Sequence, residues 1–291
     1  MNRKKNYKYI KFEQTTEGLS TITLNRPHKR NALNEPMAKE IEYVLSSLQN
    51  DTTSRVVIIK GAGPSFCSGW DLDAQKEEAQ YTNSDASRLM FQELETQFYG
   101  PIASVLRILW ESPVISIAQV QGYAIESGMG LALNCDLVIA DEDAKFFWRP
   151  VGGAGMLWHL WPWTVGLRKT KELLFEGDYV TGVEAEQMGM INKCVPLAGL
   201  DEEVMRRAKK ISAKPREFLY LDKVSVNTAF EAMGIHEACK ASAIAHILSH
   251  LTVPSLSLRD KLAKDDRKEI RRTLDRRASP LNRDQEPEYD E

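Results

Sequence analysis

The sequence has few cysteines and no long hydrophobic run. Its four cysteines, Cys67, Cys135, Cys194 and Cys239, are widely spaced and form no C-x-x-C pair. This spacing excludes the short zinc-binding and disulfide-exchange motifs and favours a reducing compartment. No stretch approaches the roughly 18 uninterrupted apolar residues of a membrane-spanning helix, and no apolar segment follows the lysines near the amino terminus. We therefore expect a cytoplasmic protein.

The chain also has little excess charge. Lys and Arg total 38 against 41 Asp and Glu, which gives a net charge of -3. Such a balance provides no electrostatic footprint for nucleic acid or an anionic membrane, so neither is expected as a partner. Hydrophobic residues make up 43% and charged residues 27% of the 291 residues, as in soluble globular proteins. The length fits two domains or one large α/β domain.

Several short apolar runs predict buried strands. Val56–Ile59 is a continuous β-branched run, as expected for a strand covered on both faces, and it leads into a Gly-rich turn. Val114–Ala118 and Leu137–Ala140 are similar, with a short helix through Leu131–Leu133 between them. A strand, a helix and a strand in this order imply a right-handed crossover in a parallel sheet.

Other segments follow hairpin and helix patterns. Alternation over residues 7–14 and 19–24, across a Gly-containing turn, predicts a β-hairpin. Asn34 is a plausible N-cap for a helix that carries apolar residues to Leu48. Helical spacing also covers residues 167–175, before Gly177, and residues 183–190. Long helical patterns continue beyond Leu200, and the acidic end of the chain predicts a solvated tail.

Two Gly-containing loops follow predicted strands, where an α/β fold opens its ligand crevice. They are Ser65–Leu72 and Gln121–Gly130, and the second runs into the start of a helix. Small residues leave backbone N–H groups free, and two such donors from separate loops can hold an oxyanion that develops on a carbonyl or thioester oxygen. Taken alone, Gly-rich turns after strands are more often simple tight connections.

Four motifs in order resemble those of the crotonase superfamily, also called the enoyl-CoA hydratase/isomerase family. The resemblance covers about residues 9–196 and rests on Leu24–Leu33, Phe66–Leu72, Val120–Asp136 and the pair Leu174–Asp178 with Ala185–Ile191. It implies a ββα spiral core and a C-terminal helical oligomerisation region. It also implies an acyl-CoA substrate, with coenzyme A part of that substrate, no metal and no separate cofactor.

The resemblance also suggests how the chain is divided. Residues 1–200 would form the spiral core that binds acyl-CoA and carries the catalytic groups. Residues 201–280 would form the helical region that builds a homotrimer or a dimer of trimers. Residues 281–291 remain as the solvated tail.

Residue by residue, the resemblance makes the backbone amides of Trp70 and Ser127 the oxyanion donors. Ser127 stands where the family usually has Gly or Ala, which is acceptable because only its backbone donates. The loop from Arg26 to Leu33 resembles the one that receives the adenine and phosphates of CoA, so it is expected to bind substrate through Arg26, Lys29, Arg30, Ala32 and Leu33. For the basic residues, a solvated turn is the alternative.

Both glutamates that share water addition in the family's hydratases are missing from the pattern. The first position matches Gly130, and residues 144–171, which contain the second, include no Asp or Glu. Two-glutamate hydration is therefore not expected, whereas enolate stabilisation needs only the two backbone donors.

Proton transfer must then use other residues. Glu126 is the first candidate, because an ionisable group beside an oxyanion donor is unusual; its alternative is a carboxylate that stabilises a helix start. His159 is the second, with a buried structural histidine as its alternative. Asp71 fits the family's loop and is expected to form a turn beside Leu72 in the substrate-binding segment. Asp73, Glu77 and Glu78 follow as weaker candidates.

An aromatic cluster is expected to face the acyl group. Four of the six tryptophans, Trp148, Trp158, Trp161 and Trp163, fall between residues 148 and 163. If they line the pocket, its flat walls suit a cyclic or aromatic acyl group; core or subunit-interface packing is the alternative, above all for Trp161 and Trp163. Arg149 could pair with a substrate carboxylate or carbonyl, or with a neighbouring subunit.

Together these features predict a crotonase-type enzyme that acts on an unsaturated, cyclic or β-oxo acyl-CoA through a stabilised thioester enolate. Within that class, hydration or double-bond isomerisation competes with hydrolytic C–C cleavage, such as ring opening of a cyclic acyl-CoA, because both pass through the enolate. A non-catalytic acyl-CoA-binding or assembly subunit is the alternative from another class.

Overall fold

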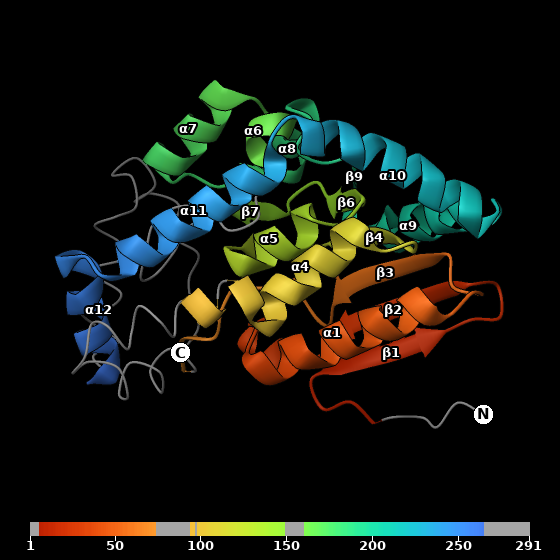
Figure 1. Ribbon diagram of the computed structural model, residues 1–291. Helices are drawn as coiled ribbons and strands as arrows, with labels where there is room; N and C mark the ends of the chain where they lie inside the picture. Colours follow the sequence, from red (N-terminus) through yellow and green to blue (C-terminus); the bar gives the residue numbers. More distant parts are fainter. Residues whose placement is uncertain (1–5, 74–93, 97, 149–159, 265–291) are drawn as a thin grey trace.

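The computed structural model describes residues 6–73, 94–96, 98–148 and 160–264 (Figure 1). In these parts of the chain, six strands form one sheet in the order β1-β2-β3-β4-β6-β9, and three more form a small sheet in the order β5-β7-β8. The expected acidic tail lies outside the described residues.

The large sheet begins with the expected hairpin. β1 (Ile10–Gln14) pairs antiparallel with β2 (Leu19–Leu24). The first strand was predicted to start at residue 7, but it starts at Ile10. Just before and at this start, the backbone amides of Tyr9 and Ile10 donate to the Glu40 carboxylate and not to another strand.

The remaining strands of this sheet are parallel, as the strand-helix-strand pattern predicts. They are β3 (Val56–Gly61), β4 (Ile115–Val120), β6 (Leu137–Asp141) and β9 (Lys193–Val195). Along β3, Val57 and Ile59 enter one buried cluster, whereas Val56 and Ile58 enter another. Burial on both faces explains why the run is continuously apolar.

Helices cover both faces of this sheet. α1 (Glu35–Asn50) begins at Asn34, whose side chain accepts a hydrogen bond from the Met37 amide, and lies beside α4 (Pro101–Glu111) (Figure 1). Their buried residues include Ile41, Leu45 and Leu109, which belong to the same cluster as Val57 and Ile59. α9 (Leu197–Ser212) covers the opposite face with Leu200, Val204 and Ala208.

The small sheet was not predicted, because its strands are only two or three residues long. β5 (Tyr123–Ile125) pairs in parallel with β7 (Lys145–Phe147), which pairs antiparallel with β8 (Val180–Thr181). α5 (Ser127–Leu133) follows β5 almost directly and is the short helix expected between the buried strands.

Three short helices precede the last strand. α6 (Trp161–Thr164) leads to α7 (Leu167–Glu176), which ends at Gly177 in the left-handed conformation, as predicted. α8 (Gly182–Gln187) begins with a capping box between Thr181 and Glu184. The prediction that it reaches residue 190 is wrong, because Gly189 has a φ of 77° and ends the helical geometry.

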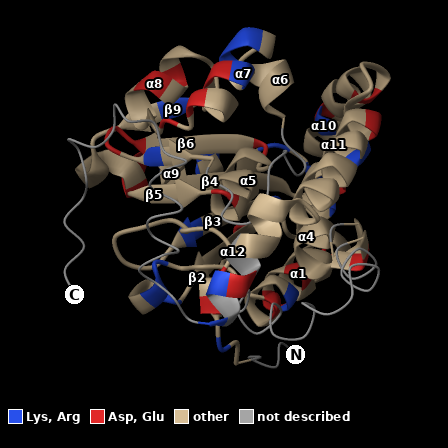
Figure 2. Cartoon of the chain, turned by 90° about the vertical axis from the view of Figure 1, so that its left-hand side faces the viewer, with Lys and Arg blue, Asp and Glu red and all other residues tan. Residues whose placement is uncertain are grey.

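The C-terminal part is helical, as expected. It contains α10 (Arg216–Ala232), α11 (Ile235–His250) and α12 (Val253–Ala263), and in Figure 1 α11 runs below α7 from α10 toward α12. No helix within the described ranges is both long and apolar enough to cross a bilayer. Figure 2 shows basic and acidic positions spread over several elements, with both signs on α7, in keeping with the small net charge.

Candidate active site

Two loops that follow neighbouring parallel strands lie against each other. β3 pairs with β4, so the segments after Gly61 and Val120 leave the same edge of the sheet. Beyond the strands, the Cys67 amide donates to the Tyr123 carbonyl and the Ile125 amide donates to the Cys67 carbonyl, each at 2.9 Å. The two Gly-containing loops are therefore adjacent.

Gly128 allows their close approach. A Cβ at this position would lie 2.5 Å from the Cys67 carbonyl oxygen and 2.7 Å from the Cys67 Cβ, nearer than real Cβ atoms come. Any side chain would push α5 away from the first loop. Gly128 thus keeps the first turn of α5, which includes Ser127, against the segment that carries Trp70.

The Trp70 amide points toward the second loop. On the other side of the first loop, the Leu33 amide donates to the Gly69 carbonyl, and the Asp71 amide donates to the Leu33 carbonyl, both at 2.7 Å. Successive peptide groups of an extended segment point to opposite sides, so the Trp70 N–H points away from Leu33. It donates to Oε2 of Glu126 at 3.2 Å. The amide expected to bind an oxyanion therefore holds a carboxylate oxygen.

Glu126 has an unusual backbone conformation. Its φ of 48° and ψ of -116° lie in a region that disfavours L-residues, at a cost on the order of 1–3 kcal/mol. The surrounding bonds hold it there: its amide donates to the Phe147 carbonyl, and its carbonyl accepts from the Gly130 amide, both at 2.8 Å. The fold therefore keeps a strained residue between the two expected oxyanion donors.

Ser127 has two hydrogen-bond donors, its hydroxyl and its backbone amide, and only the hydroxyl has a partner among the described residues. Its hydroxyl donates to Oε2 of Glu126, the same atom that Trp70 reaches. Its backbone amide makes no hydrogen bond with another described residue. Gly69, with a φ of 94°, completes the contact, because a Cβ there would lie 3.1 Å from that carboxylate oxygen.

Arg26 binds the loop Ser65–Leu72 through an ion pair with Asp71. Its guanidinium pairs with the Asp71 carboxylate at 2.6 Å and donates to the Ala32 carbonyl at 2.6 Å. Both charged side chains are nearly buried, with 11% and 9% exposed. Two of its guanidinium nitrogens thus have partners within the protein, and its contact with a phosphate of CoA stays a prediction.

The other predicted CoA-binding residues divide by exposure. Lys29 is partly exposed and pairs with Asp73, and the Arg30 guanidinium lies 5.5 Å from the ring centre of Tyr123. Ala32 and Leu33 are buried, so only their backbone groups face the loop. Lys29 and Arg30 are therefore the members of this set whose charged side chains are exposed.

Asp71 acts in the turn as well as in the ion pair. Its Oδ1 accepts from the Asp73 amide at 3.0 Å, while its Oδ2 binds Arg26. Both carboxylate oxygens thus have partners in the loop, and this arrangement makes Asp71 a positioning group. The neighbouring Leu72 is exposed at the same end of the segment.

The aromatic cluster is described only in part. Trp148 is buried and packs edge to face on Trp161, with ring centres 5.8 Å apart. Trp163, the other described tryptophan of this cluster, lies on α6 and lines a cavity next to Leu160 and Thr164. The remaining predicted residues, Arg149, Trp158, His159, Glu77 and Glu78, lie outside the described residues.

The sequence analysis missed two polar residues that fix the loops. Asn31 is fully buried, accepts from the Arg26 amide at 2.9 Å and donates to the Ser65 carbonyl at 2.8 Å. Its φ of 56° is a left-handed conformation that Asn tolerates, so an Asn within a basic turn was the available signal.

Asp141 is the second missed residue. Its carboxylate accepts from the Gly122 amide at 2.9 Å and ties the second loop to β6. Burial raises the pKa of this carboxyl, and the amide donors oppose that effect. Nothing in the sequence around Asp141 links it to a residue 19 positions earlier.

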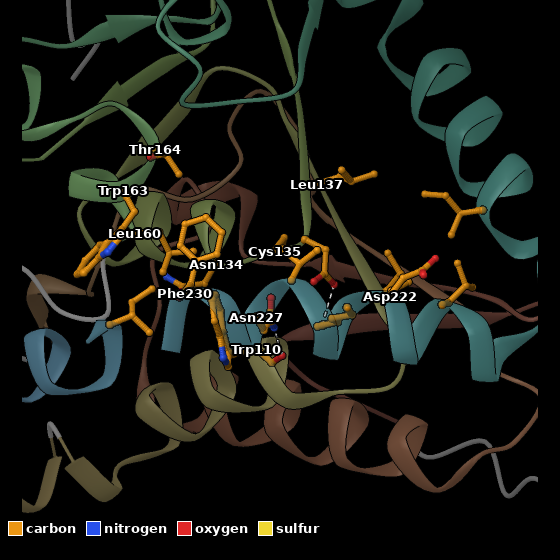
Figure 3. Close-up of a pocket in the computed structure, with 17 residues that line it drawn as sticks. Trp110, Asn134, Cys135, Leu137, Leu160, Trp163, Thr164, Asp222, Asn227 and Phe230 are labelled. Carbon is orange, nitrogen blue, oxygen red and sulfur yellow. Dashed lines mark hydrogen bonds and ion pairs between the residues drawn. The ribbon is translucent and has the colours of Figure 1, made fainter. Parts of the chain in front are cut away.

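A cavity of about 420 Å³ lies elsewhere in the molecule (Figure 3). It is lined by Cys135 after the C-terminal end of α5, by Trp110 of α4 and by Phe230 of α10, whereas the Trp70 and Glu126 contact lies at the N-terminal end of α5. At its wall, the buried Lys223 ammonium binds the Asp136 carboxylate at 2.9 Å. The cavity and the Trp70–Glu126 contact therefore lie at opposite ends of α5, and Trp163, which was predicted to face the acyl group, lines the cavity.

Comparisons with known proteins agree with the geometry. A family model for enoyl-CoA hydratase/isomerase matches residues 14–250. A putative enoyl-CoA hydratase of Mycobacterium tuberculosis is 32% identical over 263 residues, which cover 85% of this chain and 82% of that protein. A short-chain-enoyl-CoA hydratase of Clostridium acetobutylicum is 31% identical over 225 residues, which cover 73% of this chain and 79% of that protein.

A solved structure gives the same answer for the fold. An enoyl-CoA hydratase/isomerase from Xanthobacter autotrophicus Py2 aligns with a TM-score of 0.80 at 31% identity and covers 94% of this chain and 99% of that chain. The molecule is a crotonase-fold enzyme with a helical C-terminal region. The chain belongs to the enoyl-CoA hydratase/isomerase family, which confirms the resemblance found in its motifs.

Proposed function

We propose that the protein binds an acyl-CoA thioester and stabilises its enolate through the backbone amides of Trp70 and Ser127. The observation that carries this proposal is the 3.2 Å contact between the Trp70 amide and Oε2 of Glu126. A carboxylate oxygen carries negative charge, as an enolate oxygen does. The Trp70 amide is thus oriented to bind an anionic oxygen before any substrate arrives.

Backbone amides suit this task because the fold holds them rigidly. Cys67, Leu33 and Asp71 fix the loop on both sides of Trp70, and Gly128 fixes the position of Ser127. Donors held in place cost little reorganisation when charge develops, and one such donor is typically worth about 10²–10³-fold in rate.

Glu126 is the residue we assign to proton transfer. When a thioester oxygen takes its place on the Trp70 amide, the carboxylate remains attached to the same strand end, near the carbons that flank the thioester. From there it can remove the proton from the α-carbon and return one to the product. His159 remains a second candidate for this role.

The reaction class follows from the groups that are missing. Gly130 occupies the position expected for the first hydratase glutamate, and residues 144–171 contain no carboxylate. A single acid/base with an enolate site suits double-bond isomerisation of an unsaturated acyl-CoA, or C–C bond hydrolysis of a cyclic or β-oxo acyl-CoA. The edge-to-face pair of Trp148 and Trp161 is buried in the main hydrophobic cluster, so it favours core packing for these two rings, and the preference for a cyclic acyl group does not rest on them.

We further propose that coenzyme A is part of the substrate and that no other cofactor takes part. Lys29 and Arg30 are the groups that would meet its phosphates. Both lie on the loop that contacts the Trp70 segment, since the Ser68 amide donates to the Arg30 carbonyl at 3.0 Å.

The helical C-terminal region supports a homotrimer or a dimer of trimers. Phe218, Leu221 and Val226 on α10 are 62%, 62% and 58% exposed, and Met233 follows at 64%. Exposed apolar side chains on one element favour contact with another subunit. A cytoplasmic location fits the four free thiols, three of which are buried.

Hydrogen exchange tests the proposed chemistry. The protein is incubated in deuterated water with saturated, unsaturated, cyclic, aromatic and β-oxo acyl-CoAs, and the α-carbon of each is followed by NMR and mass spectrometry. We expect deuterium at the α-carbon of at least one member, and a ring-opened or shortened acid would identify C–C hydrolysis. Tight binding of several members without exchange or product would overturn the proposal in favour of a non-catalytic binding subunit.

A further inference from the structure

The site that is expected to bind an anionic oxygen already contains one. Oε2 of Glu126 accepts a hydrogen bond from the Trp70 amide, at 3.2 Å, and another from the Ser127 hydroxyl. A ligand oxygen cannot use the Trp70 amide until this carboxylate has left it. Because the occupant belongs to the chain, it is present at every substrate concentration.

The position of this carboxylate is built into the fold. The left-handed backbone of Glu126 directs its side chain over Gly69, where a Cβ would lie 3.1 Å from Oε2. A hydroxyl at residue 127 adds a second donor to the same oxygen. Oε2 of Glu126 is thus placed on the Trp70 amide by three residues: Glu126 itself, Ser127 and Gly69.

We propose that Glu126 competes with the substrate thioester for the Trp70 amide, and that the Ser127 hydroxyl is the positioning group that holds Glu126 there. This inference rests on the proposed function and adds a specificity device to it. Only a ligand whose own oxygen replaces the carboxylate gains the Trp70 hydrogen bond, and the same event frees Glu126 beside the substrate. Glu126 can therefore transfer a proton only when the thioester oxygen has taken its place on the Trp70 amide.

The competition reduces affinity in a way that depends on the carbonyl. In the occupied state the Glu126 carboxylate binds the Trp70 amide, and in the open state it does not. If the occupied state dominates, the apparent dissociation constant of a thioester is raised by the ratio of the occupied to the open population. A CoA thioether with the same chain has a methylene in place of the carbonyl and makes no demand on the Trp70 amide. Its affinity is therefore independent of where the Glu126 carboxylate lies.

The test compares these two ligands by calorimetry. The measured quantity is the ratio of thioether to thioester dissociation constants, for a saturated acyl chain that does not react. It is determined for the wild type and for Glu126→Gly and Ser127→Ala. Glu126→Gly suits the left-handed backbone, Ser127→Ala keeps the amide, and thermal melting checks that each is folded. Ser68→Ala is the matched control, because its hydroxyl donates to the Lys29 carbonyl in the same loop and does not touch Glu126.

We expect the ratio to rise about fivefold or more in Glu126→Gly and about threefold or more in Ser127→Ala, with thioether affinity and the Ser68→Ala ratio unchanged. A wild-type ratio well above one that stays the same or falls in both variants would overturn the competition. A rise in Glu126→Gly alone would overturn the role of Ser127. A ratio near one in every protein has a different meaning: the thioester oxygen does not use the Trp70 amide, and the proposed function itself fails.

Discussion

The Arg26 guanidinium and the Asp71 carboxylate form a nearly buried ion pair, 2.6 Å apart, directly after the Trp70 peptide. Arg26 belongs to the loop after β2 and Asp71 to the loop after β3, so the pair joins two strand ends. Since Asp71 also donates its amide to Leu33, the pair helps to fix the direction of the Trp70 N–H. Arg26, which the resemblance assigns to substrate binding, therefore also fixes the loop that carries Trp70.

Arg26→Ala should destabilise the protein by about 3–5 kcal/mol, because it leaves the Asp71 carboxylate buried without its partner. The measurement is the free energy of unfolding in urea. Lys29→Ala is the control: it breaks the exposed pair with Asp73 and should cost less than about 1 kcal/mol. Equal losses in the two variants would show that Arg26 does not anchor the loop.

Glu126→Gln should slow α-proton exchange at least about tenfold, or about 1.4 kcal/mol of barrier, because the amide cannot accept the proton. The hydrogen bond from Trp70 can still be accepted by the amide oxygen, so stability should change little. Exchange rates are measured at saturating acyl-CoA. An unchanged rate would move the acid/base assignment to His159 or to the residues 73–78.

Lys223→Met should destabilise the protein by about 3–5 kcal/mol without changing the exchange rate of the folded enzyme. Its ammonium donates to the Asp136 carboxylate and to the Leu109 carbonyl at the wall of the cavity. This wall lies beyond the C-terminal end of α5, whereas the Trp70 amide lies near the N-terminal end of that helix. The double variant with Asp136→Asn should lose less than the sum of the two single losses, because no unpaired charge remains. Additive losses, or a slowed exchange rate at full folding, would contradict this assignment.

Glu186 should make stability fall in acid. The Cys194 thiol donates to its carboxylate at 2.9 Å and Lys193 pairs with it, and these contacts lower its pKa from 4.5 to about 2. A carboxyl whose pKa is lower in the folded state stabilises the protein fully above its unfolded pKa and loses that contribution as pH falls toward the folded value. The window is therefore pH 4.5 to about 2.

The check is the free energy of unfolding across that window for the wild type and Glu186→Gln. The variant should show a shallower fall between these pH values and a lower stability at pH 7. Parallel curves would mean that Glu186 does not contribute to the acid sensitivity.

The large sheet could be predicted because its chemistry is local. The β-branched run at Val56–Ile59 indicates β3 from a few neighbouring residues, and in the same way Gly177 marks the end of helix α7. The small sheet could not, because β5, β7 and β8 are stabilised by pairing with one another rather than by their own composition. Strands of two or three residues show no readable period.

The site could be located from sequence but not assembled. The family pattern assigns the oxyanion donors to Trp70 and Ser127, and the structure brings the two loops that carry them together; their role stays a prediction. The contact between Trp70 and Glu126 spans 56 residues, and the pairing of Arg26 with Asp71 spans 45, so neither was visible in a local pattern. The phosphate contact of Arg26 was inferred from the resemblance of its loop to the family's CoA-binding loop, and the sequence of that loop does not show that Arg26 pairs with Asp71.

A crystal structure with a bound, unreactive acyl-CoA thioester tests the central claim most directly. We predict that the thioester oxygen lies about 2.7–3.1 Å from the backbone nitrogens of both Trp70 and Ser127, with the Glu126 carboxylate displaced toward the α-carbon. A thioester directed into another cavity, with Oε2 of Glu126 still on the Trp70 amide, would contradict the account.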